Sequence, residues 1–329
     1  MDTAGWFALA GGVGLFLYGL QLMAEGMEAA AAGPLRGMVA GLVRSVPRGI
    51  LVGAAITGVV QSSAAVTLLA ISLAGSGLIP LAGAAGVVMG ANIGTTVTAQ
   101  LLRFTGAGAA ALPALLAQGC CLAGAAATLF CRKGPLRAAG QAVLGFGLLF
   151  SGLGGVRSAA APLGQSPAFI RMLSGLRHPL PGLAAGAVSS MLLQSSSAAV
   201  GLLQALAATG AVHWGLAVPV VLGQNLGACA TPLLAARAGG AGAGRQCARF
   251  HLLFNLLGGI ACLGLMGAAS LLGLGDALLQ PADPGGIANF HTLFNLGATL
   301  VLAPFTSPLL ALAGAGLTPG RQKAPAQPA

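Results

Sequence analysis

The chain has 329 residues, of which only 5 are Asp or Glu and 15 are Lys or Arg, giving a formal net charge of +10. Charged residues make up 6% and hydrophobic residues 56% of the sequence, and the mean hydropathy is +0.90. A soluble domain needs a surface that is about a quarter charged. The composition therefore excludes a water-soluble globular protein, and the lack of a basic arm or domain excludes a nucleic-acid-binding protein.

Apolar stretches long enough to cross a bilayer follow one another along nearly the whole chain. A membrane-spanning helix needs about 20 such residues. We expect spans near residues 5–24, 49–75, 79–102, 109–130, 138–156, 182–208, 212–236, 250–273 and 287–313. The sequence thus predicts an all-α, polytopic membrane protein with one membrane domain over residues 1–317. The Pro-rich end, residues 318–329, is expected to be a disordered tail.

The first polar group within these apolar stretches is Gln61, Ser62 and Ser63, with Thr67 one turn later. A lone Ser in a membrane helix usually bonds back to a carbonyl of its own helix. Consecutive amide and hydroxyl side chains cover most faces of a helix, so some of them must be satisfied inside the protein. A break at this point would also free backbone groups for a ligand.

The next stretch carries Gly90-Ala91-Asn92-Ile93-Gly94, followed by Thr95 and Thr96. Glycines on both sides of Asn92 let a backbone unwind or approach a ligand closely. The Asn carbonyl and the Thr hydroxyls are hard oxygen ligands. The alternative interpretation is helix packing through small residues, with Asn92 as an interhelical hydrogen-bonding group.

Both polar groups recur 133 residues later. Gln194, Ser195, Ser196 and Ser197 repeat the first group, and Asn225 within Gly223–Gly227 repeats the second. We therefore predict two repeats, over about 5–130 and 138–273, followed by an extra helix at 287–313. Two repeats are common in secondary transporters.

The relative orientation of the repeats depends on residues 49–75. If this stretch is a full span, the repeats are parallel, whereas a hairpin broken at the Gln-Ser-Ser group makes them inverted. We favour the hairpin, because a polar group at mid-helix suits a broken helix around a binding site. With either topology most Lys and Arg lie on one side, which predicts an outside N-terminus and a cytoplasmic C-terminus in the cell membrane.

A further motif, Phe-His-x-x-Phe-Asn, occurs at 250–255 and again at 290–295. His and Asn four residues apart share one helical face. We favour a buried hydrogen-bonding role that braces the core helices, and a proton or substrate role is the alternative.

None of the five carboxylates lies in a repeated polar group. This argues against a proton relay and against a magnesium or calcium site. Neutral carbonyl and hydroxyl oxygens can hold sodium, and hydroxyls together with helix N-termini can hold an anion. The residues therefore suit sodium plus an anionic substrate.

Duplicated Gln-Ser-Ser groups, each followed by Gly-x-Asn-[Ile/Leu]-Gly, together with later His-x-x-Phe-Asn helices, resemble the sodium/phosphate cotransporter family, the type II group and its bacterial relatives. The resemblance covers about residues 10–313. It implies sodium-coupled transport of inorganic phosphate through a two-repeat helical core. It places the substrate and ion sites at Gln61, Ser62, Ser63, Thr67, Asn92, Thr95, Thr96, Gln194, Ser195, Ser196, Ser197 and Asn225.

Two departures from the family pattern stand out. Ala64 occupies a position where the family commonly has a third Ser, which bears on the coupling stoichiometry. Many bacterial relatives carry a PhoU-like domain after the membrane part, so we expect any such regulator to be a separate protein.

The leading hypothesis is a sodium-dependent phosphate symporter that works by alternating access in the lipid bilayer. The alternatives are a carrier of another oxyanion, a phosphate exporter, and a membrane sensor or assembly subunit that binds phosphate without moving it. We expect no enzymatic activity and no cofactor other than the coupling ion, because the sequence has no GxxxxGK[ST] loop and no HExxH motif.

Overall fold

The computed structural model describes residues 2–31, 35–103, 111–131, 133–174, 178–239 and 242–316, and every regular element in these ranges is a helix. Six helical segments within them are long and apolar enough to cross a membrane. These are Thr3–Ala30, Leu81–Leu102, Pro135–Gln165, Trp214–Ala238, Gly242–Leu274 and Pro284–Gly314. The expected all-α, multi-pass fold is confirmed.

Three helices of the first repeat form a unit in which the middle helix turns back. They are α3 (Val46–Val60), α4 (Ser63–Gly75) and α5 (Leu81–Leu102). A Cβ on Gly49 would touch Gly83 early in α5, and a Cβ on Gly94 late in α5 would touch Thr57 late in α3. The helices α3 and α5 therefore run parallel to each other. Because α4 joins the end of α3 to the start of α5, it runs antiparallel to both. Residues 49–75 are thus a hairpin rather than one full span.

The second repeat has the same arrangement. Its helices are α9 (Pro179–Leu193), α10 (Ser196–Ala207) and α11 (Trp214–Gly227). A Cβ on Gly182 would touch Leu216 and Pro219 early in α11, and a Cβ on Gly227 would touch Ala187 and Ser190 late in α9. Residues 182–208 are therefore a second hairpin. After α11 the chain turns at residues 228–229 and continues as α12 (Ala230–Gly239).

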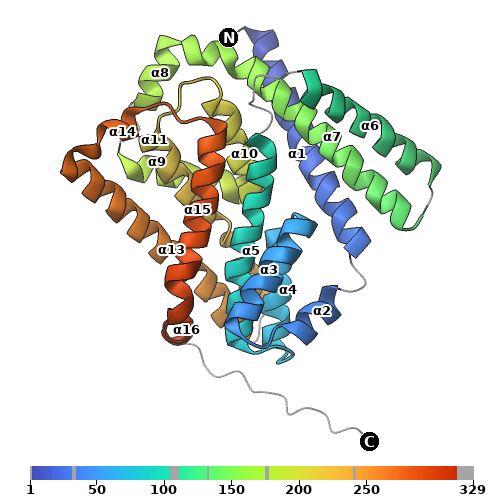
Figure 1. Ribbon diagram of the computed structural model, residues 1–329, viewed down its shortest axis with the longest axis vertical. Helices are drawn as coiled ribbons and strands as arrows, with labels where there is room; N and C mark the ends of the chain where they lie inside the picture. The colour runs from blue at the N-terminus through green and yellow to red at the C-terminus, as the bar shows by residue number, and fades with distance from the viewer. Residues whose placement is uncertain are drawn as a thin grey trace, which may run out of the picture.

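Two later helices pack against the repeats. They are α13 (Gly242–Ala269) and α15 (Pro284–Leu302), and α16 (Thr306–Gly314) follows α15 (Figure 1). Gln100 of α5 donates to Thr292, whereas Arg103, one turn later, donates to Asn289, so α5 and α15 run antiparallel. Trp214 at the start of α11 packs against Phe290 and Gly286 near the start of α15, and Asn225 near the end of α11 donates to Asn295, so α11 runs parallel to α15. It follows that α5 and α11 run in opposite directions.

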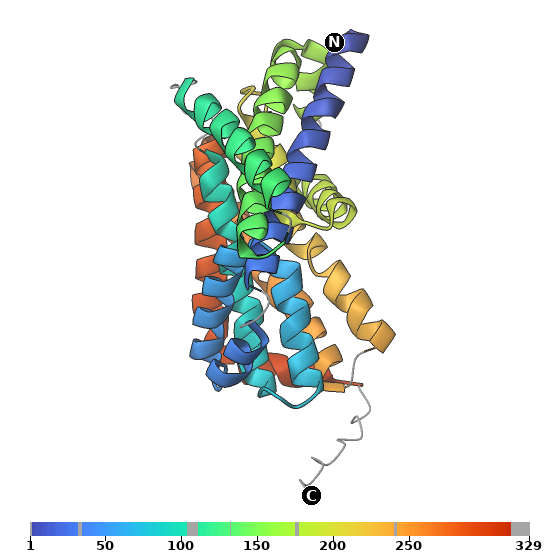
Figure 2. The same ribbon diagram turned by 90° about the vertical axis from the view of Figure 1, so that its right-hand side faces the viewer.

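The remaining long helices form a bundle at one side of the molecule (Figure 1). They are α1 (Thr3–Ala31), α6 (Ala111–Phe130) and α7 (Pro135–Ala160), while α2 (Leu35–Leu42), α8 (Pro167–Ser174) and α14 (Asp276–Leu279) are short. Figure 2 shows α1 and α7 side by side over much of their length. Their close approach depends on glycine, because a Cβ on Gly145 would lie 2.6 Å from the carbonyl oxygen of Gly19.

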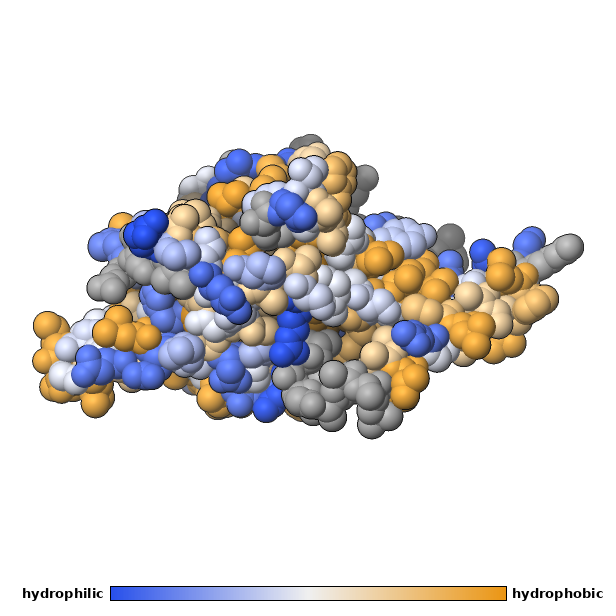
Figure 3. Space-filling model, turned by 90° about the horizontal axis from the view of Figure 1, so that it is seen from above, coloured by the Kyte–Doolittle hydropathy of each residue, from blue (hydrophilic) through white to orange (hydrophobic). Residues whose placement is uncertain are grey.

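The outer surface is apolar to a degree that water would penalise. Leu271 is 90% exposed, Phe130 86% and Leu192 79%. Seen from the end near the N-terminus, hydrophilic residues are scattered over the middle and hydrophobic residues gather toward both flanks (Figure 3). A polar end with apolar sides is the surface expected of a protein surrounded by lipid.

The predicted spans match these helices with three exceptions. The stretch 212–236 is interrupted at residues 228–229, between α11 and α12. The stretches 49–75 and 182–208 are each divided into two short helices, as the favoured hairpin prediction requires. Part of the stretch 109–130 and the whole of the predicted tail, 318–329, lie outside the described residues.

Candidate functional site

Both Gln-Ser-Ser groups are helix breaks with the same backbone geometry. Gln61 ends α3 at φ 60°, ψ 20°, and Gln194 ends α9 at φ 51°, ψ 23°. Within the described ranges these are the non-glycine residues with positive φ. Such a conformation costs about 1–3 kcal/mol and is retained mainly at functional sites. Two glutamines with this conformation at equivalent positions of the repeats make the region a candidate functional site.

The residue after each glutamine caps the following helix. The Ser62 hydroxyl accepts from the Ala65 N–H at 3.3 Å, and the Ser195 hydroxyl accepts from the Ala198 N–H at 3.1 Å. The first N–H groups of α4 and α10 have no carbonyl of their own helix to bond. Both helices therefore begin with free donors and the positive end of the helix dipole.

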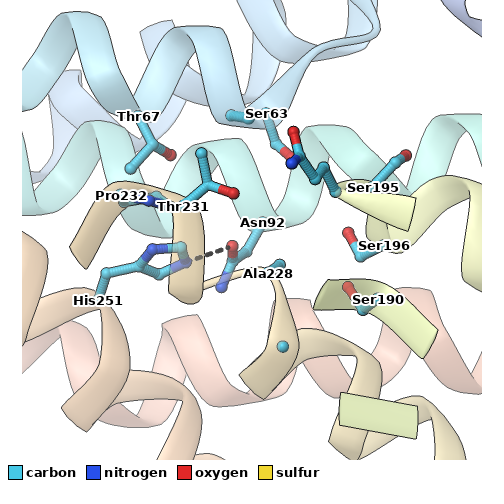
Figure 4. Close-up of a pocket in the computed structure, with 13 residues that line it drawn as sticks. Ser63, Thr67, Asn92, Ser190, Ser195, Ser196, Ala228, Thr231, Pro232 and His251 are labelled. Carbon is cyan, nitrogen blue, oxygen red and sulfur yellow. Dashed lines mark hydrogen bonds between the residues drawn. The ribbon is translucent and has the colours of Figure 1, made fainter. Parts of the chain in front are cut away.

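The two helix beginnings meet at one pocket (Figure 4). Ser63 and Ala64 of α4 line it together with Ser195 and Ser196 of α10. The other lining residues are Thr67, Asn92, Ser190, Gln194, Gly227, Ala228, Thr231, Pro232 and His251. None of the thirteen is Asp, Glu, Lys or Arg. The pocket therefore offers hydroxyl, amide and backbone groups rather than fixed charges.

A hydrogen-bonded triad fixes one wall of the pocket. Asn92 of α5 donates to the Asn255 side-chain oxygen of α13 at 3.0 Å, and the Asn255 amide donates to the His251 carbonyl at 3.0 Å. The Asn92 oxygen lies 3.3 Å from His251 Nε2 (Figure 4). Since an amide oxygen can only accept, this contact is satisfied when the imidazole carries its proton on Nε2.

The second repeat carries the same triad. Asn225 of α11 donates to the Asn295 side-chain oxygen of α15 at 2.9 Å, and its own oxygen lies 3.2 Å from His291 Nε2. Asn295 donates to the His291 carbonyl at 2.8 Å. The repeated Phe-His-x-x-Phe-Asn motif thus joins each repeat to a later helix, which agrees with the bracing role favoured from the sequence. The Nδ1 atoms of both histidines are buried without a hydrogen-bonding partner among the described residues.

The pocket includes half of the site residues expected from the sequence. These are Ser63, Thr67, Asn92, Gln194, Ser195 and Ser196.

The other six lie outside its lining, and their role as ligands stays a prediction. Gln61 accepts from the Thr98 hydroxyl, Ser62 is a helix cap, and Asn225 belongs to the second triad. Thr95 and Thr96 donate to carbonyls of their own helix, those of Ala91 and Ile93. Ser197 is buried in α10.

Three polar lining residues were not among the expected ligands. Ser190 lies one turn before Gln194, and its buried hydroxyl has no partner among the described residues. The signal for it is the repeat itself, because Thr57 occupies the equivalent position 133 residues earlier and is likewise unpartnered. His251 belongs to the repeated Phe-His-x-x-Phe-Asn motif, which the sequence analysis identified without assigning it to the site. Thr231 follows Asn225 by six residues.

Paired helix breaks at one pocket, in two repeats embedded among membrane-spanning helices, are typical of secondary transporters. The chain belongs to the family described as Na+/Pi-cotransporter, which it matches over residues 15–158 and 166–280. This membership supports phosphate transport as the activity.

Two individual relatives are each less than 30% identical to the chain. The chain is 27% identical over 293 residues to the uncharacterized protein YqeW of Bacillus subtilis, covering 89% of this chain and 92% of YqeW. It is 29% identical over 304 residues to YjbB of Escherichia coli, whose name provisionally assigns it inorganic phosphate export. That match covers 92% of this chain but 54% of YjbB, so the chain spans about half the length of that relative. No solved structure matches the chain significantly.

Proposed function

We propose that this chain is a sodium-coupled transporter of inorganic phosphate in the cell membrane, operating by alternating access around the pocket between the two Gln-Ser-Ser breaks. The observation that carries the proposal is the meeting of the α4 and α10 N-termini at that pocket. Two positive dipole ends with free N–H groups and hydroxyls form a site for a phosphate-like anion.

The same pocket supports a coupling cation. None of its lining residues is Asp, Glu, Lys or Arg, so no fixed positive charge offsets a bound phosphate. Carrying an unaccompanied anion through a site of low dielectric is costly. Sodium bound by neutral oxygens, such as those of Ser190, Thr231 and Gln194, would reduce the net charge of the loaded pocket. The opposite directions of α5 and α11 favour inverted repeats, which alternating access uses.

Uptake of labelled phosphate into proteoliposomes with an imposed sodium gradient tests the proposal. We expect flux that requires sodium and that Gln194→Ala and Ser196→Ala reduce. Equal flux with sodium replaced by choline would contradict the coupling, and stronger inhibition by sulfate than by unlabelled phosphate would identify a carrier of another oxyanion.

A phosphate exporter is the second candidate, and the provisional name of YjbB favours it. Vesicles loaded with phosphate, with sodium gradients imposed in either direction, separate the two. An exporter releases phosphate down its own gradient whichever way the sodium gradient points. Phosphate binding without any flux would instead indicate a sensor or assembly subunit.

A further inference from the structure

One pair of equivalent residues makes different contacts in the two repeats. The repeat offset of 133 aligns Gln61 with Gln194 and Thr98 with Thr231. In the first repeat the Thr98 hydroxyl donates to Gln61 Oε1, and neither residue lines the pocket. In the second repeat Gln194 and Thr231 both line the pocket, and neither side chain makes a hydrogen bond to any other residue in the described ranges. The Gln–Thr pair is therefore hydrogen-bonded in the first repeat and not hydrogen-bonded in the second.

The backbone differs at the matching place. The helix α5 is continuous from Leu81 to Leu102. Its counterpart is interrupted at residues 228–229, the turn between α11 and α12, just before Thr231. A continuous helix brings Thr98 to Gln61, whereas the turn carries Thr231 away from Gln194. Figure 4 shows the Thr231 side chain directed into the pocket.

The α5 helix carries local features that would let it bend at the same position. Thr95 and Thr96 are the counterparts of residues 228 and 229, and both donate to carbonyls of α5 rather than to another helix. Such back-bonding weakens and bends helices. Gly94 precedes them, as Gly227 precedes the turn in the second repeat.

We propose that Gln61–Thr98 and Gln194–Thr231 are two alternative latches, of which one closes when the other opens. In the second state α11 and α12 become continuous and Gln194 accepts from Thr231, while α5 bends at Thr95–Thr96 and releases Thr98. Thr98 and Thr231 are then positioning residues of the cycle. The inference rests on the proposed transport function, because only exchange between two states gives the latches a purpose.

Distance measurements between two spin labels test the latches without phosphate. One label replaces Leu234 on α12 and the other Leu78 after α4, which are 64% and 52% exposed. The half-buried native cysteines are first replaced by Ser, and these are Cys120, Cys121, Cys131 and Cys262. The buried Cys229 and Cys247 are retained. Straightening of α12 onto α11 moves Leu234 relative to α4, so the two states give different distances.

The two threonine variants should act in opposite directions. Thr98→Val removes the closed latch and should shift the ratio of states about three- to tenfold toward the second distance, the effect of one net hydrogen bond. Thr231→Val should shift the ratio the other way, and Thr98→Ser should restore the original distribution. Thr128→Val is the matched control, because the Thr128 hydroxyl bonds only its own helix in α6.

Shifts of the same sign in both variants, or no shift in either, would overturn the latches. If Thr98→Val fails to fold, Thr231→Val measured in sodium-free buffer still decides the question. The Thr231 hydroxyl makes no hydrogen bond to another residue in the described ranges, so without sodium its loss should deplete the second distance. Opposite shifts without phosphate flux would refute the proposed function alone, and flux without shifts would refute the latches alone.

Discussion

The triad at Asn225 can be tested by a double-mutant cycle. Asn225, His291 and Asn295 are each at most 5% exposed, so the hydrogen bonds between them have no competing water. Asn225→Ala removes the bonds of 2.9 Å to Asn295 and 3.2 Å to His291. Hydrogen bonds between membrane helices contribute about 0.6 kcal/mol on average and about 1.7 kcal/mol at most. The free energy of unfolding should therefore fall by about 1–3 kcal/mol.

The cycle combines Asn225→Ala, His291→Ala and the double variant. The free energy of unfolding is measured by reversible denaturation in mixed micelles. We expect a coupling energy of about 1 kcal/mol between Asn225 and His291, because the double variant loses their shared bond only once. The equivalent cycle at Asn92 and His251 should give a similar value. A coupling within about 0.3 kcal/mol of zero would show that the Asn225–His291 contact does not stabilise the protein.

Three further predictions follow from the packing and the pocket. Gly186→Ala should lower the folded yield after detergent extraction, because the added Cβ would meet the Val220 carbonyl and overpacking costs about 1–3 kcal/mol or more. Gly259→Ala should leave the folded yield unchanged, because the added Cβ would have no atom within 4 Å. Ser196→Ala should raise the phosphate KM about tenfold or more, because it removes a hydrogen bond to a charged ligand. Ser189→Ala should keep the original KM, because the Ser189 hydroxyl donates to the Gly186 carbonyl outside the pocket. Ser62→Ala should lower the free energy of unfolding by about 0.5–2 kcal/mol, because it removes the N-cap of α4. Its effect on the phosphate KM should be smaller than that of Ser196→Ala. An equal effect on KM would place Ser62 among the phosphate ligands.

Hydropathy and repetition were sufficient to predict the long apolar helices and the positions of the two Gln-Ser-Ser breaks. Apolar length determines which segments can span the bilayer, and a cluster of polar residues inside such a segment has to be satisfied within the protein. The match between Gln61 and Gln194 therefore predicted two helix breaks, and their αL conformations were found at those residues.

Membership of a motif does not specify the direction in which a side chain points. Thr95 and Thr96 lie in a polar segment beside Asn92, yet a hydroxyl in a helix can bond its own carbonyls, and both do. Asn92 and Asn225 occupy equivalent positions, but only Asn92 lines the pocket. The turn at residues 228–229 of the second repeat has no counterpart in the continuous helix α5, so the repetition of the sequence could not predict it.

Counterflow tests whether the pocket between the α4 and α10 N-termini conducts phosphate. Proteoliposomes are loaded with unlabelled phosphate in symmetric sodium, and labelled phosphate is added outside at trace concentration. Exchange requires neither a net gradient nor a known direction of transport. We predict transient accumulation of label above that in empty vesicles, which Ser196→Ala strongly reduces and Ser189→Ala leaves unchanged. If labelled phosphate accumulates no more than in empty vesicles, or if Ser196→Ala does not reduce its accumulation, the pocket does not conduct phosphate.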